Sequence, residues 1–208
     1  MEAVIGVVGA GRMGRGIALS YAYSGQRVAL IDLKARSTSE WQQMVVAGKA
    51  ELRADLNFLA SVNLLNEGEV ERILNLISDH HRGDASTVLG QCPIIYEGVP
   101  EVMSAKEAVF AFVSEVVPND TVIASTTSTF LVTELAKFVR SPERFMNAHW
   151  LNPAHLMPLV EISKSEQTST EAVTQLRTSL EAIGKKTVVC NASPGYIVPR
   201  IQALAMNE

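Results

Sequence analysis

The feature that most constrains the fold of this chain is a glycine-rich turn near its start, VVGAGRMGRGIA at residues 7–18. The apolar, β-branched run that leads into it, residues 4–8, is typical of a strand buried on both faces. From about Arg12 onward, apolar residues recur at helical spacing. The segment therefore predicts a buried strand, a tight turn and a helix in direct succession.

Within the turn, Gly9, Gly11 and Gly14 follow the G-x-G-x-x-G pattern. Gly9 permits the tight turn, Gly11 lets the backbone approach a pyrophosphate, and Gly14 lets the helix lie close to the strand. Free N–H groups at the helix start favour phosphate. The turn predicts a dinucleotide site with Arg12 and Met13 beside the phosphates, although a solvated first-turn arginine is an equal alternative for Arg12.

A second apolar run, residues 28–31, ends in Asp32, which lies 18 residues after Gly14. This is close to the spacing expected for a carboxylate that binds a ribose 2′-hydroxyl. A carboxylate there would repel a 2′-phosphate, which favours NAD over NADP, while Lys34 and Arg36 keep NADP open. The alternative is that Asp32 only caps the next turn.

Composition excludes several classes of protein. The 208 residues are 47% hydrophobic and 19% charged, and the net charge of −4 gives no reason to expect nucleic acid or acidic lipid as a partner. No apolar stretch approaches the ~20 residues of a membrane helix, and we expect no signal peptide. Cys92 and Cys190 adjoin apolar runs, which favours buried free thiols in the cytoplasm. His80 and His81 lack metal-ligand spacing, so no metal site is expected.

Alternating strands and helices predict a Rossmann-type, doubly wound, mostly parallel sheet. After the second strand, residues 39–78 are expected to form a helical hairpin, broken at 66–68, with an apolar stripe of Leu52, Leu56, Leu59 and Val62. Pro100 is expected to open one helix, and a capping box of Thr168 and Glu171 another. Further strands are expected at residues 93–96, 121–124, 145–148, 159–162 and 187–190, with the sheet changing direction at 159–162.

The domain organisation expected is a dinucleotide-binding domain over residues 1–192 and the start of a helical domain over 193–208. The sequence stops within the apolar segment 196–206, which looks helical. We therefore expect the rest of a C-terminal helical domain to be missing from this sequence.

Reactive side chains follow three expected strands, at residues 97–101, 125–128 and 149–152. In a doubly wound sheet, function gathers at the carboxyl ends of the strands. The densest group lies within residues 147–161, which hold two histidines, an Asn-Pro turn and a strand that contains Glu161.

The string HWLNPAHLMPLVEI, residues 149–162, resembles the active-site segment of the 3-hydroxyacyl-CoA dehydrogenase family. The glycine turn, IASTTSTF at 123–130 and ASPGYIV at 192–198 resemble the same family, in the same order. The resemblance covers essentially the whole chain as an N-terminal domain. It implies NAD-dependent oxidation in fatty acid metabolism, and a homodimer if the helical domain is present.

Residue by residue, the resemblance implies that His149 is the catalytic acid and base, with Glu161 as its partner. Ser128 would contact the substrate oxygen and the nicotinamide region, and Asn152 would fix that geometry. This fits the chemistry, because alcohol oxidation needs a base for the hydroxyl proton and imidazole titrates near neutral pH. A carboxylate on the second ring nitrogen would fix the tautomer.

The resemblance also implies that Glu101 and Lys106 lie near the ribose and nicotinamide half of the cofactor. The alternatives are that Glu97 and Glu101 are solvated acids, Glu101 in the first turn of its helix. His155 is interpreted as a surface or packing residue.

Two departures from the family pattern bear on the substrate. The family usually has asparagine after Gly-Phe-Ile-Val, whereas this chain has Gly-Tyr-Ile-Val followed by Pro199. Proline offers neither a side-chain amide nor a backbone N–H. In addition, the helical hairpin offers a phosphate-rich ligand only a thin set of candidates: Lys49, Arg53 and Ser61, interleaved with Glu51 and Asp55.

Three functions follow as hypotheses. The leading one is NAD-dependent oxidation of a 3-hydroxyacyl-CoA to the 3-ketoacyl-CoA. The second keeps hydride transfer but acts on a free hydroxy acid, as in gulonate- or carnitine-dehydrogenase-like relatives. The third is a non-catalytic, dinucleotide-binding or structural protein, similar to the lens crystallin related to this family.

Overall fold

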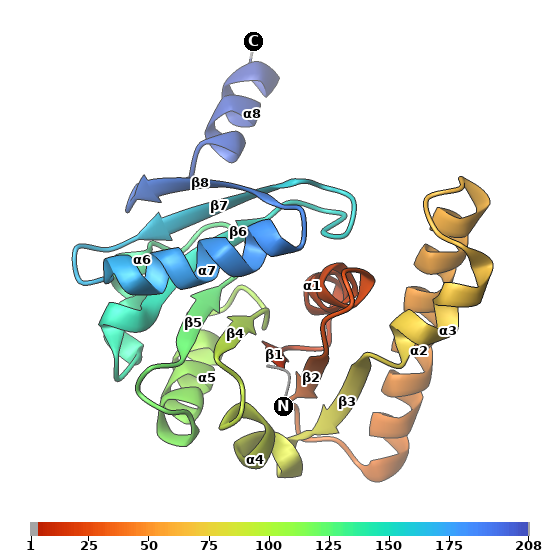
Figure 1. The fold of residues 1–208 in the computed structure, drawn as a ribbon. Helices are drawn as coiled ribbons and strands as arrows, with labels where there is room; N and C mark the ends of the chain where they lie inside the picture. The colour runs from red at the N-terminus through yellow and green to blue at the C-terminus, as the bar shows by residue number, and fades with distance from the viewer. Residues whose placement is uncertain (1–3, 208) are drawn as a thin grey trace.

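The computed structural model describes residues 4–207 and builds them around one eight-stranded sheet (Figure 1). The strand order is β3-β2-β1-β4-β5-β6-β7-β8. Neighbouring strands are parallel except for β6 and β7, which are antiparallel. The strands are β1 (Ile5–Val8), β2 (Val28–Asp32), β3 (Ile77–His81), β4 (Ile94–Glu97), β5 (Val122–Ser125), β6 (Phe145–Trp150), β7 (Leu159–Lys164) and β8 (Lys186–Asn191). The doubly wound, mostly parallel fold is confirmed, as is the change of direction at β7.

Helices cover both faces of the sheet. Side chains alternate between the two faces along each strand, and here both faces are apolar, so each needs a covering layer. In β1, Val7 belongs to one apolar cluster with residues of α1, α2, α3 and α7. Its neighbour Val8 belongs to a second cluster with residues of α4, α5 and α6. The helices are α1 (Arg12–Tyr23), α2 (Thr38–Ser61), α3 (Val70–Leu74), α4 (Ala85–Leu89), α5 (Met103–Val116), α6 (Val132–Leu135), α7 (Thr170–Ala182) and α8 (Val198–Met206).

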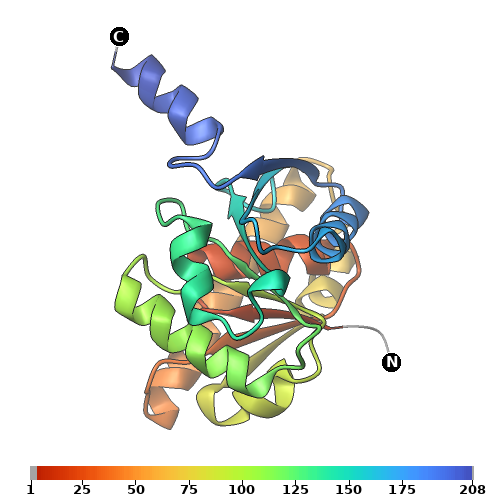
Figure 2. The ribbon, with the colours of Figure 1, turned by 90° about the vertical axis from the view of Figure 1, so that its left-hand side faces the viewer.

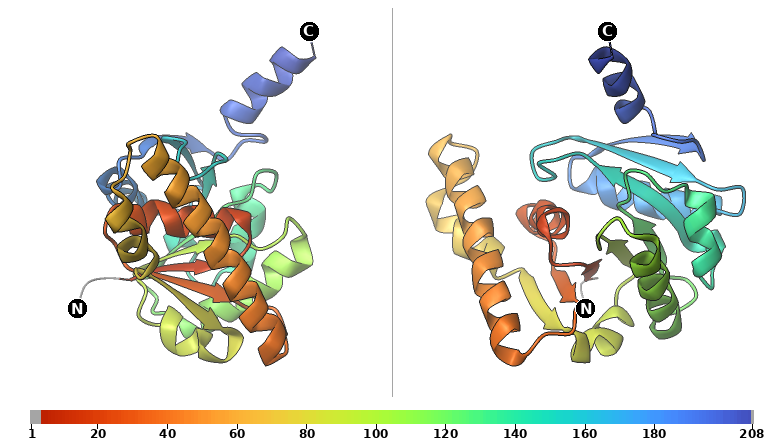
Figure 3. Two further views of the ribbon diagram at one scale, coloured as in Figure 1. Left: turned by 90° about the vertical axis from the view of Figure 1, so that its right-hand side faces the viewer. Right: turned by 180° about the vertical axis from the view of Figure 1, so that it is seen from behind.

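The excursion after β2 is a long helix, α2, followed by the short helix α3, and both lie beside the β3 edge of the sheet (Figure 3). The buried side of α2 consists of Gly48, Leu52, Leu56 and Leu59. The expected stripe is therefore confirmed except at Val62, which is 46% exposed. Val62 follows the last helical residue, so it no longer continues the helical spacing.

Three local expectations are wrong. The hairpin does not continue to residue 78, because Ile77–His81 pairs with β2 as an edge strand. Pro100 does not open α5: Val102 is extended, and the helix begins at Met103. The cap of α7 is Ser169, whose Oγ accepts the Ala172 N–H. Of the expected buried thiols, Cys92 is buried and Cys190 only half-buried.

The C-terminal helix α8 extends away from the body of the molecule (Figure 2). It has no buried residue, and Ile201, Leu204 and Met206 are exposed. Within residues 4–207, none of the helices combines the length and the apolar character needed to span a membrane.

Candidate active site

The glycine turn joins β1 to α1 and has the geometry that its three glycines require. Gly9 has φ +108°, and a Cβ there would lie 2.6 Å from the carbonyl oxygen of Gly98. A Cβ on Gly14 would lie 1.9 Å from the carbonyl oxygen of Gly9, so the helix can approach the strand only without a side chain. A Cβ on Gly11 would meet nothing within 4 Å, which leaves open space at the start of α1.

The start of α1 is suited to a phosphate. Its N-cap is Gly11, and no side chain makes a capping hydrogen bond there. Among the described residues, the first turn of α1 contains no acidic side chain. The first backbone N–H groups are therefore available to an anion. The side chain of Met13 packs against the apolar core, so its backbone N–H is the part of that residue that can face a phosphate.

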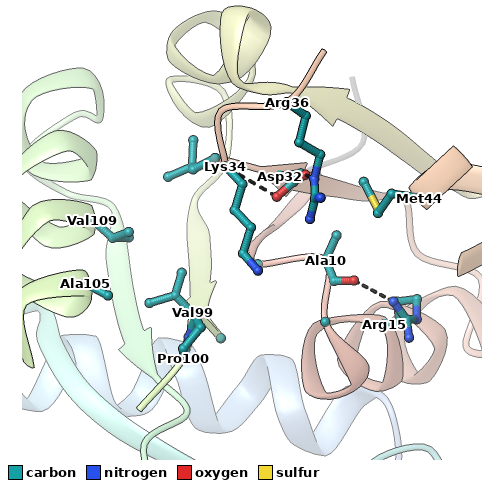
Figure 4. Close-up of a pocket in the computed structure, with 14 residues that line it drawn as sticks. Ala10, Arg15, Asp32, Lys34, Arg36, Met44, Val99, Pro100, Ala105 and Val109 are labelled. Atoms are coloured by element: carbon teal, nitrogen blue, oxygen red, sulfur yellow. Dashed lines mark hydrogen bonds and ion pairs between the residues drawn. The ribbon is translucent and has the colours of Figure 1, made fainter. Parts of the chain in front are cut away.

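A cavity of about 640 Å³ lies beside this turn and reaches Asp32 at the end of β2 (Figure 4). Asp32 is buried; its Oδ2 accepts from Arg36 Nε at 2.6 Å, and its Oδ1 accepts from the Lys34 N–H at 3.3 Å. Asp32 thus caps the turn and also lines the cavity. The Lys34 side chain extends into the cavity in Figure 4.

The opposite wall of this cavity is apolar and includes Val99, Ala105 and Val109 (Figure 4). A phosphate-binding turn, a carboxylate and an apolar wall are together the partners that a dinucleotide needs for its pyrophosphate, ribose and adenine. The residues present therefore fit NAD, with Gly9, Gly11 and Asp32 lining the same cavity.

A fully buried ion pair joins Glu97, at the end of β4, to Lys106 in α5. Lys106 Nζ lies 3.0 and 3.1 Å from the two carboxylate oxygens. Ser125 Oγ and the Val99 N–H also donate to this carboxylate, at 2.6 and 2.8 Å. The interpretation of Glu97 as a solvated acid is therefore wrong, and its part in an enclosed ion pair was not predicted from the sequence. The available signal was an acid at the end of a buried strand with a lysine nine residues later.

Glu101 holds the loop that follows β5. Its Oε1 accepts the Oγ1 hydroxyls of Thr127 and Thr129 and the N–H groups of Ser128 and Thr129. Lys106 Nζ lies 3.3 Å from Oε2. Burial alone would raise the pKa of Glu101, but these hydrogen bonds and the charge of Lys106 outweigh it and lower the pKa. Glu101 precedes α5, so it does not lie in the first turn of a helix.

The loop leaves the side chain of Ser128 exposed while its backbone is fixed by Glu101. A hydroxyl in this position can donate to a carbonyl oxygen or accept from an alcohol. The loop follows β5, and its strand neighbour β6 runs in the same direction and carries His149 near its carboxyl end. Ser128 and His149 therefore belong to the same edge of the sheet.

His149 and Glu161 face each other across the antiparallel pairing of β6 with β7. Nδ1 of His149 lies 2.8 Å from Oε2 of Glu161, and both side chains are buried. The second carboxylate oxygen, Oε1, accepts the backbone N–H groups of Ile197 and Val198 at 2.8 and 2.9 Å. Both oxygens of Glu161 are thus satisfied, and the carboxylate fixes the position of Nδ1.

Asn152 and Arg12 lie elsewhere, in the lining of a second cavity of about 480 Å³ between α1, α2 and the loop after β6. Asn152 is exposed. His155, half-buried in the same loop, lines this cavity too, and burial lowers its pKa. The other two histidines lie in β3, where His80 Nε2 pairs with the Ser78 hydroxyl and His81 Nδ1 accepts the Gly83 N–H.

Comparison with known proteins decides the family. The family model described as "3-hydroxyacyl-CoA dehydrogenase, NAD binding domain" matches residues 4–193. The chain belongs to the 3-hydroxyacyl-CoA dehydrogenase family. The family match confirms the resemblance that the four motifs indicated, and it confirms NAD as the cofactor.

Relatives of this family are considerably longer than the chain. The fatty acid oxidation complex subunit alpha of Idiomarina loihiensis is 34% identical over 196 residues, which cover 94% of this chain and 26% of that protein. The chain thus spans about a quarter of the length of that curated relative.

Solved structures show the same fold. The 3-hydroxybutyryl-CoA dehydrogenase of Escherichia coli K12 is 30% identical with a TM-score of 0.86, and the match covers all of this chain and 44% of that one. The (S)-3-hydroxybutyryl-CoA dehydrogenase PaaH1 of Ralstonia eutropha is 28% identical with a TM-score of 0.87, covering all of this chain and 70% of that one.

Proposed function

We propose that this chain is the NAD-binding part of a dehydrogenase that oxidises a 3-hydroxyacyl-CoA to the 3-ketoacyl-CoA. The observation that carries the proposal is the hydrogen bond from His149 Nδ1 to Glu161, beside the loop that presents Ser128. Family membership supports the same activity.

In this proposal, His149 Nε2 takes the proton of the substrate hydroxyl. Nδ1 is already bound to Glu161, so the neutral ring presents its free nitrogen to the substrate. The carboxylate then stabilises the imidazolium that forms. Ser128 binds the substrate oxygen as alcohol and as ketone. Asn152, exposed in the lining of the second cavity, is proposed to orient the substrate from that side. Bound NAD supplies the hydride acceptor.

The residues proposed for the cofactor divide by position. The turn glycines and the N–H groups of Arg12 and Met13 bind the pyrophosphate, and Asp32 binds the adenosine ribose. Glu101 and Lys106 fix the loop that borders the nicotinamide half. Arg36 Nε already donates to one oxygen of Asp32. When the ribose binds, Arg36 must therefore either share this carboxylate with the ribose hydroxyl or move away from it.

The test is His149→Ala, assayed with 3-hydroxybutyryl-CoA and NAD. We expect turnover to fall by about 10²–10⁴ while the Kd for NAD stays unchanged, because the base is lost and the phosphate site is not. His80→Ala, which removes a histidine in β3, is the matched control and should leave turnover unchanged. Unaltered turnover in His149→Ala would remove the assigned base. NAD binding without turnover of any hydroxyacyl compound would favour the non-catalytic alternative.

A free hydroxy acid is the second candidate, and two observations favour it: the pairing of the polar groups of α2, and the charges of the second cavity, which α2 helps to line. Lys49 lies 3.5 Å from Asp79, Arg53 is paired through two hydrogen bonds with Glu71, and the Ser61 hydroxyl donates to a backbone carbonyl. The groups considered for phosphate binding are therefore engaged.

The cavity itself is lined by Glu51 and Asp55, together with Arg12 and Arg15. Arg15 in turn is paired with Glu51. Comparing kcat/KM for 3-hydroxybutyryl-CoA and free 3-hydroxybutyrate decides between the candidates. If the thioester is the substrate, Glu51→Gln with Asp55→Asn should lower KM for it, since two charges that repel its phosphates are removed.

A further inference from the structure

The ring of Tyr196, which has no part in the proposed mechanism, lies flat against the imidazole of His149. The rings of Tyr196 and His149 are stacked, with centroids 4.5 Å apart and planes 11° from parallel. Tyr196 is 5% exposed. An offset stack of this kind restricts rotation of the imidazole about its side-chain bonds.

The backbone at Tyr196 adopts an uncommon conformation. Tyr196 has φ +47°, in the left-handed region that an aromatic residue rarely adopts, and it follows Gly195 at φ +76°. Strain of this kind persists where surrounding contacts enforce it, and it gathers at functional sites.

The hydroxyl of Tyr196 makes two further contacts. It donates to the Thr127 carbonyl at 2.7 Å and accepts from Asn147 Nδ2 at 3.0 Å. Burial raises the pKa of this hydroxyl well above its ordinary value, so it remains a donor across the neutral range. Thr127 precedes Ser128 in the loop, and Asn147 lies on the same face of β6 as His149.

The residues that follow Tyr196 act on the partner of His149. The N–H groups of Ile197 and Val198 donate to Glu161, so residues 196–198 contact both members of the pair. A residue that only filled space would need the ring but not the hydroxyl. In this chain the hydroxyl oxygen of Tyr196 reaches two elements of the site, the loop after β5 and the strand β6.

We propose that Tyr196 is a positioning residue: its ring sets the plane of the His149 imidazole, and its hydroxyl fixes that ring to the loop that presents Ser128. Its effect on turnover rests on the proposed function, whereas its effect on the ring of His149 does not.

The experiment compares Tyr196→Phe and Tyr196→Leu with the wild type by two readouts. The first is the NMR signal of the His149 ring N–H that is bound to Glu161, assigned by its absence in His149→Ala. The second is kcat and KM. Tyr196→Phe should keep the signal, speed its exchange with water and lower kcat by about three- to tenfold. Tyr196→Leu should broaden the signal and lower kcat by about 10²-fold, with KM for NAD unchanged, because a misplaced base costs rate rather than cofactor binding.

Tyr23→Leu is the control, since Tyr23 is an exposed tyrosine of α1 whose hydroxyl also donates to a backbone carbonyl. It should change neither readout. A folded Tyr196→Leu with the wild-type signal and kcat overturns the proposal. If that variant does not fold, Tyr196→Phe decides, and unchanged exchange and kcat overturn the role of the hydroxyl. A wild type that turns over no hydroxyacyl compound overturns the proposed function, and the NMR signal still tests the positioning.

Discussion

At the scale of single residues, the site combines charges that are buried with charges that reach solvent. Glu97 and Lys106 are enclosed: Glu97 accepts from Lys106 and from two neutral donors, and Lys106 binds the carboxylates of Glu97 and Glu101. Glu101 differs, because its side chain is 36% exposed and still binds four donors through one oxygen. A carboxylate that is hydrogen-bonded yet open to water can titrate without unfolding its surroundings, so its contribution can be measured.

Glu101→Gln gives a pH-dependent prediction. The pKa of Glu101 is lowered in the folded protein, so its ionised form stabilises the fold at pH values above about 4.3, the unfolded-state pKa, and this contribution is lost as the pH falls through the lower folded-state pKa. Urea unfolding should show the variant less stable than the wild type near neutral pH, with the difference vanishing in acid. Glu107→Gln, an exposed acid of α5, is the control. A difference that is independent of pH would contradict the assignment.

At the scale of elements, the β1–α1 turn contains one glycine that the fold requires, Gly14, and one that NAD binding is proposed to require, Gly11. Gly14→Ala places a Cβ 1.9 Å from a backbone oxygen and should destabilise the protein by about 2–4 kcal/mol. Gly11→Ala places its Cβ in open space, where the pyrophosphate is proposed to lie, and should leave the Tm unchanged while weakening NAD binding about 10- to 100-fold.

Thermal unfolding and NAD titration on the same two preparations check this pair. Each variant is the control for the other, since both add one methyl group to the same turn. Tight NAD binding by Gly11→Ala would mean that the pyrophosphate does not approach this backbone.

The same turn shows why part of the fold could be predicted from the sequence. Its signals are local: a β-branched run, three glycines and an apolar helical face follow one another along the chain. The edge strand β3 could not be predicted in this way, because Ile77 is its one buried residue and polar residues follow. Its pairing with β2 makes it a strand, and that pairing is tertiary information.

The residues of the candidate site also fall into two groups, those that local motifs predict and those that only tertiary contacts bring together. Motif resemblance brought together His149, Glu161 and Ser128, each of which lies within a recognisable string. The contact of Tyr196 with His149 joins residues 47 positions apart in the numbering, and the burial of Glu97 depends on a helix that packs over β4. The stacking leaves no periodic or spaced pattern in the sequence, and the nine-residue spacing of Glu97 and Lys106 does not by itself show that the ion pair is enclosed.

At the scale of the whole molecule, the question is where the sheet domain ends. The division expected from the sequence lies after residue 192, and we propose that the rigid part of the domain extends to Val198. Residues 196–198 contact the histidine and its carboxylate, whereas α8 beyond them buries no side chain. An isolated helix of nine residues is marginally stable in water, and tertiary packing supplies most of the stability of such helices.

Hydrogen exchange tests this boundary in the 208-residue chain. Amides of α8 from Ile201 onward should exchange within about tenfold of unfolded rates, because their local opening free energy is near zero. The amides of Ile197 and Val198 should be protected through Glu161, and those in the middle of α7, whose Leu176 and Leu180 are fully buried, should be among the slowest. Protection along α8 equal to that of α7 would contradict the boundary, since it would require a packing partner for Ile201, Leu204 and Met206.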